Sequence, residues 1–271
     1  MTEKLLLVEK QDRVCTITLN RPEHRNALNP ELLAELVETM EALNEDDEIR
    51  AVVIRGAGEK AFSGGFDIGR ISTRAASTPE PDQNARRSAS SRSVLGPALN
   101  SIRRCRYPVI AMIYGFAVGG GCDLAASCDL RFAAEDARLG MTPAKLGVMY
   151  DHDGIQRFID LVGVGGAKEL FFTGSLIDAR RAKEMGLVNR LAPAGELATV
   201  TYAVAQEIAA NAPLSVSGMK TTINKLTGFR RLSADEEAEL SSLVIKCASS
   251  EDLKEGQRAF IEKRKPNFRG R

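Results

Sequence analysis

Apolar positions near the start of the chain follow two different spacings. Short apolar runs at residues 5–9 and 14–19 flank a polar turn, and this pattern predicts a β-hairpin. Asn29 followed by Pro30 is a favourable helix start, and apolar residues then recur every three or four positions between residues 32 and 43. The first segment of the chain therefore predicts strands followed by a helix that buries one face.

The same mixture continues to residue 195 and then stops. Further strands are predicted at residues 51–54, 109–114, 130–133 and 187–191, and helices at residues 94–105, 122–127, 154–162, 165–173 and 178–185. Residues 70–92 lack apolar periodicity and predict a loop, and residues 139–153 predict an irregular segment. Beyond residue 195 only helical spacing remains, at residues 196–211, 215–226, 234–248 and 251–263. We therefore expect an α/β core domain in residues 1–195 and a helical region in residues 196–271 that packs on a neighbouring chain.

Composition narrows the possible functions. The 271 residues are 44% hydrophobic and carry a formal net charge of +1, which is ordinary for a soluble protein and argues against a nucleic acid or an anionic membrane as partner. We find neither a membrane-length apolar run nor a signal peptide, so a cytoplasmic location is expected. Five cysteines without a CxxC motif and only two histidines predict reduced thiols and no metal site.

Two glycine-containing turns are the candidate parts of a catalytic site. Gly119, Gly120 and Gly121 follow an apolar strand and open a helix, so backbone N–H groups without intrahelical acceptors are exposed there. Asp123 comes directly after them, and an oxyanion-binding turn beside a carboxylate suits enolate chemistry. A similar turn, Ser63-Gly64-Gly65, lies about fifty residues earlier, and the two turns could converge on one oxygen. Taken alone, the three glycines favour a simpler interpretation, a tight packing turn between a strand and a helix.

Several ordered motifs together resemble one known family. The stretches NRPEHRNALN, AFSGGFDI, PVIAMIYGFAVGGGCDLAASCDLRFA, LGVMYDHDGIQR and EGQRAFIEKRKPNF are similar to those of the crotonase superfamily, the enoyl-CoA hydratase/isomerase family. The resemblance implies a ClpP/crotonase-like α/β fold of repeated ββα units with a helical C-terminal trimerisation region. It also implies a homotrimer, or a hexamer built as a dimer of trimers, and an acyl-CoA thioester as substrate. No cofactor is expected to be bound permanently, because the CoA moiety belongs to the substrate.

The resemblance also assigns roles to individual residues. The backbone N–H groups of Phe66 and Gly120 would bind the thioester carbonyl oxygen as an oxyanion hole. Residues that would contact CoA are Arg25, Ala27, Ser63, Gly64, Gly65, Asp67, Ile68, Phe260 and Lys263. Phe260 and Lys263 are three residues apart, which would place both on one face of the last helix.

Three positions depart from the hydratase pattern. Asp123 stands where family hydratases have their first catalytic glutamate, and the pair Pro143-Ala144 stands where the second glutamate follows a proline. The MTPxxLGVxY pattern with Tyr150 resembles the methylmalonyl-CoA decarboxylase branch, in which a tyrosine hydroxyl orients the substrate carboxylate. Decarboxylation needs no base to begin, which suits a site without the second glutamate. That branch has a histidine where this chain has Phe66.

The sequence leaves other functions open. Asp123 could serve an enoyl-CoA hydratase or an enoyl-CoA isomerase, and a base formed by Asp151, His152 and Asp153 could serve a retro-Claisen hydrolase. A non-catalytic acyl-CoA-binding protein is a fourth hypothesis. Tyr150 could instead form a pocket wall, and His152 could be an ordinary polar loop residue.

Overall fold

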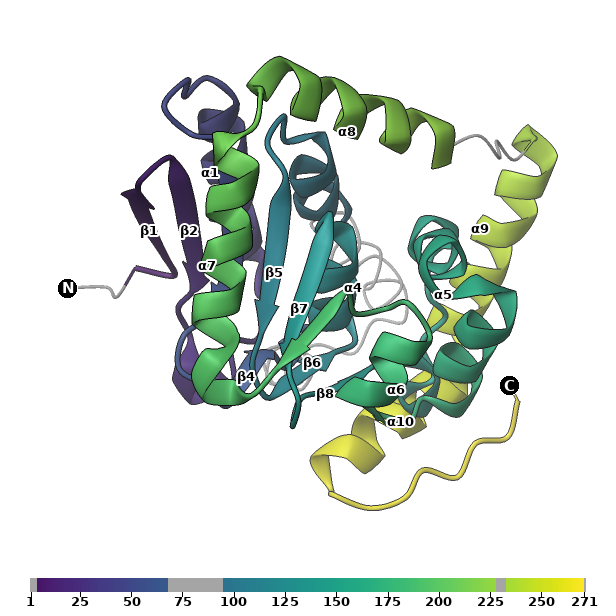
Figure 1. Ribbon diagram of the computed structural model, residues 1–271. Helices are drawn as coiled ribbons and strands as arrows, with labels where there is room; N and C mark the ends of the chain where they lie inside the picture. The colour runs from purple at the N-terminus through teal and green to yellow at the C-terminus, as the bar shows by residue number, and fades with distance from the viewer. Residues whose placement is uncertain (1–3, 68–94, 228–232, 271) are drawn as a thin grey trace.

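A six-stranded sheet forms the centre of the molecule (Figure 1). The computed structural model describes residues 4–67, 95–227 and 233–270. The strands, in their order across this sheet, are β1 (Leu6–Gln11), β2 (Val14–Leu19), β3 (Ala51–Gly56), β5 (Val109–Ile113), β7 (Leu130–Ala134) and β10 (Arg190–Ala192). β1 and β2 form the expected antiparallel hairpin, and every later neighbour pairs in parallel.

A smaller sheet lies beside the first, and two of its strands lead into the two glycine turns. Its four strands, in order, are β4 (Ala61–Ser63), β6 (Phe116–Val118), β8 (Arg138–Gly140) and β9 (Ile177–Asp178). The chain passes from the large sheet to the small one at Gly115, where φ is +56° and a Cβ atom would lie 2.1 Å from the Lys60 carbonyl oxygen. Only glycine fits that crossing, so the segment predicted as one strand running into the glycines is two strands in two sheets.

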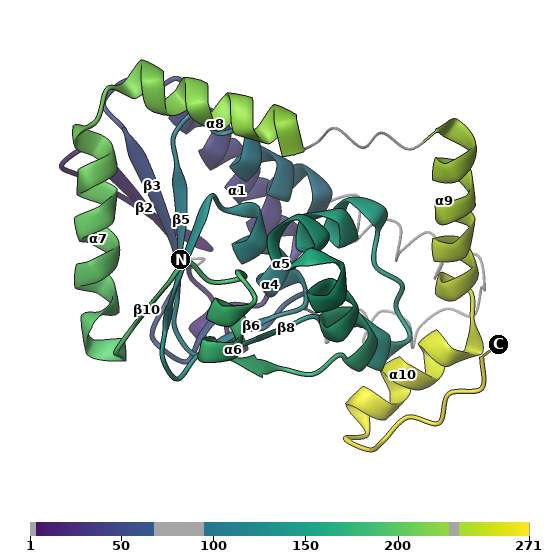
Figure 2. The same cartoon turned by 45° about the vertical axis from the view of Figure 1, so that its right-hand side comes forward.

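The helices cover the two faces of the large sheet unequally (Figures 1 and 2). They are α1 (Pro30–Asn44), α4 (Gly120–Ser127), α5 (His152–Thr173), α6 (Ala179–Glu184), α7 (Ala194–Ala210), α8 (Pro213–Thr227), α9 (Ala234–Ala248) and α10 (Glu251–Ile261), with a further helix through residues 95–104 and short 3-10 turns at Pro22–His24 and Pro143–Leu146. Among the helices of the described residues, only α7 packs over one of these faces, although the sequence placed it in the helical C-terminal region. Alternate residues of β5 separate the two cores: Val109, Ala111 and Ile113 face one, and Ile110 and Met112 face the other. Burial on both faces explains the continuous apolar run.

Several predicted boundaries differ from the structure. The two helices predicted at residues 154–162 and 165–173 are one element, α5, which is kinked at Gly163 by φ of 71° and ψ of 170°. The strand predicted at residues 187–191 begins later, at Arg190. The predicted loop at residues 70–92 lies outside the described residues.

The C-terminal helices contact the segment that leads into Tyr150. A Cβ atom on Gly147 would lie 2.7 Å from the Asp252 carbonyl oxygen, and one on Gly256 would lie 2.5 Å from Leu146. Glycine at both positions therefore lets α10 pack directly against the 3-10 turn Pro143–Leu146. None of the helices in the described parts of the chain is long and apolar enough to cross a membrane.

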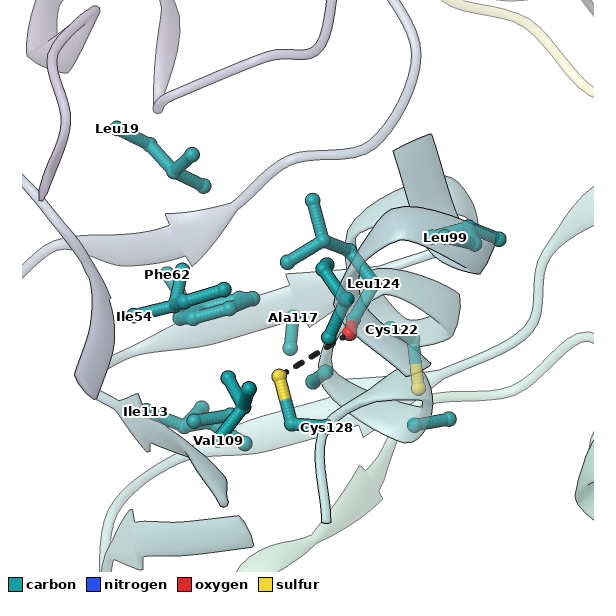
Figure 3. Packing of buried hydrophobic residues seen from close by; sticks show 14 of the residues in the cluster. Leu19, Ile54, Phe62, Leu99, Val109, Ile113, Ala117, Cys122, Leu124 and Cys128 are labelled. Carbon is teal, nitrogen blue, oxygen red and sulfur yellow. Dashed lines mark hydrogen bonds between the residues drawn. The ribbon is translucent and has the colours of Figure 1, made fainter. Parts of the chain in front are cut away.

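The thiols belong to this packing and yield the first prediction. Cys122 and Cys128 lie among buried side chains, where the Cys128 Sγ atom contacts the Leu124 carbonyl oxygen (Figure 3). Burial raises the pKa of both thiols to about 12 and that of Cys15 to about 11. Of the five cysteines only Cys247 is partly exposed. We expect one thiol to react with a disulfide reagent such as Ellman's reagent in the native protein and five to react in denaturant. Rapid reaction of two or more thiols in the native protein would contradict this packing.

Candidate active site

The backbone N–H of Phe66 is left free by the way its segment pairs. Phe66 forms a parallel bridge with Leu28, in which Leu28 N donates to Gly65 O (2.8 Å) and Asp67 N donates to Leu28 O (2.9 Å). In such a bridge the bonds come from the residues flanking Phe66, so its own N–H and C=O point to the opposite side. The Phe66 amide therefore faces away from Leu28.

The backbone N–H of Gly120 lies close to the backbone N–H of Phe66. Gly120 is the first residue of α4, so its N–H has no acceptor within the helix, and Gly119 before it adopts φ of 53° and ψ of −119°. A Cβ atom on Gly120 would lie 3.7 Å from Phe66 N, and one on Gly65 would lie 3.6 Å from Gly120 N. The two amides, from segments more than fifty residues apart, are thus adjacent. Two such donors can stabilise one oxyanion.

Buried polar groups hold the first turn in place. The Asn26 side chain donates to Ala57 O (3.1 Å) and Ala61 O (2.8 Å), and its Oδ1 accepts from Arg21 N (3.1 Å). Arg21 also pairs with Asp67 at 2.9 Å. Because these residues fasten the turn after β2 to the segment after β3, the Phe66 amide has a fixed position.

Most of the residues expected to contact CoA lie in or beside this turn. Their side chains differ in whether they are free to bind a ligand. Gly64 N donates to Arg25 O (2.8 Å), which places the exposed Arg25 beside the glycine turn. The Asp67 carboxylate is paired with Arg21, and the buried Ser63 hydroxyl accepts from Gly65 N (3.2 Å). The Ser63 and Asp67 side chains therefore build the loop. Ala27 and Gly65 lie in the same region, and Ile68 lies outside the described residues.

Asp123 lies at the centre of a buried polar cluster. Its side chain is 1% exposed, its Oδ2 accepts from the Tyr150 hydroxyl (2.7 Å), and its Oδ1 accepts from Arg157 Nη1 (3.1 Å). The structure thus joins the aspartate and the tyrosine that the sequence singled out. Arg157 was missed, although a signal was present: it is a charged residue beside Phe158 in the helix predicted at residues 154–162.

The cluster perturbs the titration of both acids. Burial raises the pKa of Asp123 above its ordinary value, although the charge of Arg157 and the hydrogen bond from Tyr150 act to lower it. Burial and the charge of Asp123 raise the pKa of the Tyr150 hydroxyl well above its ordinary value. Tyr150 therefore keeps its proton at neutral pH and donates it to Asp123.

Gly154 makes room for this hydrogen bond and gives a second prediction. A Cβ atom on Gly154 would lie 2.4 Å from Tyr150 Cε1 and 3.4 Å from Asp123 Oδ2. We expect Gly154→Ala to displace the tyrosine ring and to lower turnover on the order of tenfold or more, since misplacing a group by about 1 Å can cost that much. Steady-state kinetics would measure the loss.

Gly165→Ala is the matched control, because Gly165 lies in the same helix and a Cβ atom there would meet nothing within 4 Å. This variant should keep wild-type turnover. Equal turnover of the two variants would show that the position of the Tyr150 ring does not matter.

The run Asp151-His152-Asp153 does not join the buried cluster. The Asp151 side chain caps α5 by accepting from Gly154 N (2.8 Å). His152 Nε2 lies 3.3 Å from Asp153 Oδ1, with the two side chains 41% and 75% exposed. Asp153, which could orient His152, is thus a surface residue, and Asp151 is used as the helix cap.

The remaining predicted residues lie towards the C-terminus and on the turn before Tyr150. Phe260 is 58% exposed on α10, but the helix ends at Ile261, and Lys263 follows it with φ of 53°. The prediction of one shared helical face is therefore wrong. Ala144, which the resemblance matches to the second hydratase glutamate, is exposed on the turn Pro143–Leu146. The described residues contain no group of three His, Cys, Asp or Glu side chains that could hold a metal ion.

Comparison with known proteins shows which family the chain matches. A profile of the enoyl-CoA hydratase/isomerase family matches residues 9–271. The chain is 37% identical over 264 residues to a short-chain-enoyl-CoA hydratase of Clostridium acetobutylicum, covering 96% of this chain and 95% of that protein.

Solved structures agree with the sequence match. A methylmalonyl-CoA decarboxylase in complex with 2-nitronate-propionyl-CoA superposes with a TM-score of 0.90 at 32% identity, covering 99% of each chain. An enoyl-CoA hydratase from Bacillus anthracis superposes with a TM-score of 0.76 at 34% identity, covering 99% of this chain and 100% of that one. The expected crotonase-type α/β fold is confirmed, and the chain belongs to the enoyl-CoA hydratase/isomerase family.

Proposed function

We propose that this acyl-CoA-processing enzyme decarboxylates a short malonyl-type CoA ester, such as methylmalonyl-CoA, through a thioester enolate. The observation that carries the proposal is that the site, in the described part of the chain, has one carboxylate, Asp123, and that this carboxylate is already hydrogen-bonded. Both oxygens of Asp123 are engaged, by Tyr150 and by Arg157, and Ala144 occupies the position of the second acid. A site with one engaged carboxylate is poorly equipped to activate water, which needs a base within hydrogen-bond reach.

The paired amides supply the main catalytic effect. When the bond between the α-carbon and the substrate carboxylate breaks, CO₂ leaves and the electron pair moves into the thioester. The carbonyl oxygen becomes an anion between the N–H groups of Phe66 and Gly120, which are adjacent in the structure. A proton then adds to the α-carbon and completes the product. Tyr150 and water are the candidate donors, and Asp123 could donate only in its protonated form.

Tyr150 has the orienting role in this proposal. Its hydroxyl is held by Asp123 at 2.7 Å, and its ring contacts Phe171 with centroids 5.6 Å apart. Because its single proton is donated to Asp123, the hydroxyl would face the substrate carboxylate with the lone pairs of its oxygen. Repulsion between the two groups can turn the substrate carboxylate out of the thioester plane, where the breaking bond overlaps with the carbonyl. The effect is one of geometry, which raises the rate without requiring a base.

The proposal also includes the CoA contacts and the assembly. Arg25 is exposed beside the Gly64 turn and would meet the phosphates, and Phe260 and Lys263 near the C-terminus would meet the adenine end. The exposed apolar side chains of α8 include Leu214, Met219, Ile223 and Leu226. Such a row would be covered in a homotrimer, or in a hexamer of two trimers.

Hydration of a short enoyl-CoA is the second candidate, because the 37% identical relative is named a short-chain-enoyl-CoA hydratase. In that case Asp123 would have to release Tyr150 or Arg157 to reach water. An isomerase would make the same demand on Asp123.

One substrate panel separates these candidates. Purified protein is incubated with methylmalonyl-CoA, malonyl-CoA, crotonyl-CoA and a 3-enoyl-CoA, and the products are identified by mass spectrometry. We expect propionyl-CoA and CO₂ from methylmalonyl-CoA. Hydration of crotonyl-CoA without any decarboxylation would overturn the proposal, and tight binding without reaction would indicate a binding protein. A Gly120→Pro preparation purified in parallel controls for contaminating enzymes.

A further inference from the structure

Arg157 is a buried cation that the reaction described above does not use. Its side chain is 8% exposed, and Nη1 donates to Asp123 Oδ1 (3.1 Å) and, at 3.4 Å, to the Asp153 carbonyl oxygen. Its Nε is buried and has no hydrogen-bond partner among the residues that the structure describes. A buried guanidinium with an idle donor is costly, so its ion pair with Asp123 is the interaction that offsets this cost.

The charges around Asp123 identify Arg157 as its counter-ion. Burial raises the pKa of Asp123, and among the groups that lower it the Arg157 charge is the largest contributor. The other titratable or charged groups that face this carboxylate are Tyr150 and Asp151, which precede α5, and Arg103, on the helix through residues 95–104, with the buried Cys122 beside it on α4 itself.

A second arginine strengthens the positive potential. Arg103 lies on the helix through residues 95–104, where burial and the charge of Arg157 lower its pKa and Asp160, Asp153 and Asp123 oppose that shift. The two arginines are thus close enough to repel each other, and both favour the ionised form of Asp123. Arg157 alone is in hydrogen-bond contact with it.

We propose that Arg157 is a positioning residue: by pairing with Oδ1 it keeps Asp123 a carboxylate, so that Oδ2 accepts the Tyr150 proton and holds the tyrosine at the acyl site. Tyr150 lies just before α5 and Arg157 lies within it, on either side of Gly154 in the sequence, and both reach across to the same side chain on α4. The effect on rate rests on the proposed function, whereas the effect on the protonation of Asp123 does not.

Removing the cation should reverse the hydrogen bond. A buried carboxylate without its counter-ion takes up a proton at higher pH. A protonated Oδ2 would donate to the Tyr150 oxygen, and the tyrosine proton would then point elsewhere. The hydroxyl would no longer be held in the orientation that the substrate carboxylate meets.

The test compares Arg157→Met, which removes the charge, with Arg157→Lys, which keeps a cation. For Arg157→Met we expect the acidic limb of the pH profile of kcat to move up by about 1 to 3 pH units. At pH 7 kcat should fall about tenfold for each unit by which the limb passes that pH, with KM changed less than about threefold, and it should recover at alkaline pH. Arg157→Lys should move the limb in the same direction by less.

Infrared difference spectroscopy gives a readout that does not depend on the substrate. At neutral pH, Arg157→Met should show a protonated carboxyl band that is absent from wild type and from Arg157→Met combined with Asp123→Asn. If no malonyl-type ester is turned over, the proposed function fails while this result still stands.

Two outcomes would overturn the inference. One is an Arg157→Met protein that folds, as judged by circular dichroism, and keeps both the wild-type pH profile and an ionised Asp123. If that variant does not fold, Arg157→Gln replaces it, since the amide can keep the contact to Oδ1 without the charge. An unshifted profile for Arg157→Gln would then be decisive against the proposal.

Discussion

Replacing Gly120 with proline should lower kcat/KM on the order of a hundredfold or more, because it removes one of the two oxyanion donors. Gly120 is the first residue of α4, a position at which proline is compatible with a helix and the N–H serves no helical bond. The ring would also place a carbon atom where the carbonyl oxygen is expected to bind. Steady-state kinetics with the substrate identified by the panel would measure the loss, with the thermal unfolding midpoint recorded alongside.

Gly120→Ala is the control for this variant. It keeps the N–H, and its Cβ would lie 3.6 Å from Leu28 Cδ1 and 3.7 Å from Leu95 Cδ2, which are ordinary contacts. Its loss of activity should be much smaller than that of the proline variant. A folded proline variant that stays within tenfold of wild type would remove the oxyanion role of this amide.

Replacing Tyr150 with phenylalanine should reduce decarboxylation on the order of a hundredfold in kcat while changing the affinity for a CoA ester less than about threefold. The ring and its contact with Phe171 remain, so the pocket keeps its shape, and only the hydroxyl that is bonded to Asp123 is lost. The measurements are kcat and calorimetric binding of propionyl-CoA.

The direction in which the pH profile of Tyr150→Phe should shift follows from this hydrogen bond. The Tyr150 hydrogen bond acts to lower the pKa of Asp123, so its loss should raise that pKa further and move any acidic limb to higher pH. Tyr202→Phe is the control, because it removes a tyrosine hydroxyl that is bonded to Thr16 (3.0 Å) between α7 and β2. If Tyr150→Phe lost kcat and affinity for the CoA ester to the same extent, the tyrosine would only form part of the pocket wall.

The same few side chains distinguish the proposed decarboxylase activity from the hydratase activity for which the sequence relatives are named. The backbone donors are independent of side-chain identity, so they suit any reaction that passes through a thioester enolate. The difference lies in the acids: Asp123 is already bonded to Tyr150 and Arg157, and Ala144 stands where the resemblance to hydratases leads us to expect a second glutamate. These side chains are therefore the ones whose replacement should separate the two activities.

Local patterns accounted for much of the secondary structure. The Asn29 side chain caps α1 by accepting from Leu32 N, as the Asn-Pro sequence indicated, and α9 spans Ala234–Ala248 as predicted. The patterns failed where a tertiary contact decided the backbone. At Gly115 the approach of Lys60 forces a turn between two sheets, and at the end of α10 the helix stops before Lys263.

By itself the sequence determined the family, the two glycine turns and the candidate acids, because motifs and capping residues act over a few neighbouring positions. Only the tertiary structure decided that the amides of Phe66 and Gly120 lie side by side and that Arg157 reaches Asp123. The physical reason is distance along the chain. Asp123 and Arg157 are 34 residues apart, so packing of α4 against α5, and no local pattern, sets whether a buried carboxylate has a counter-ion.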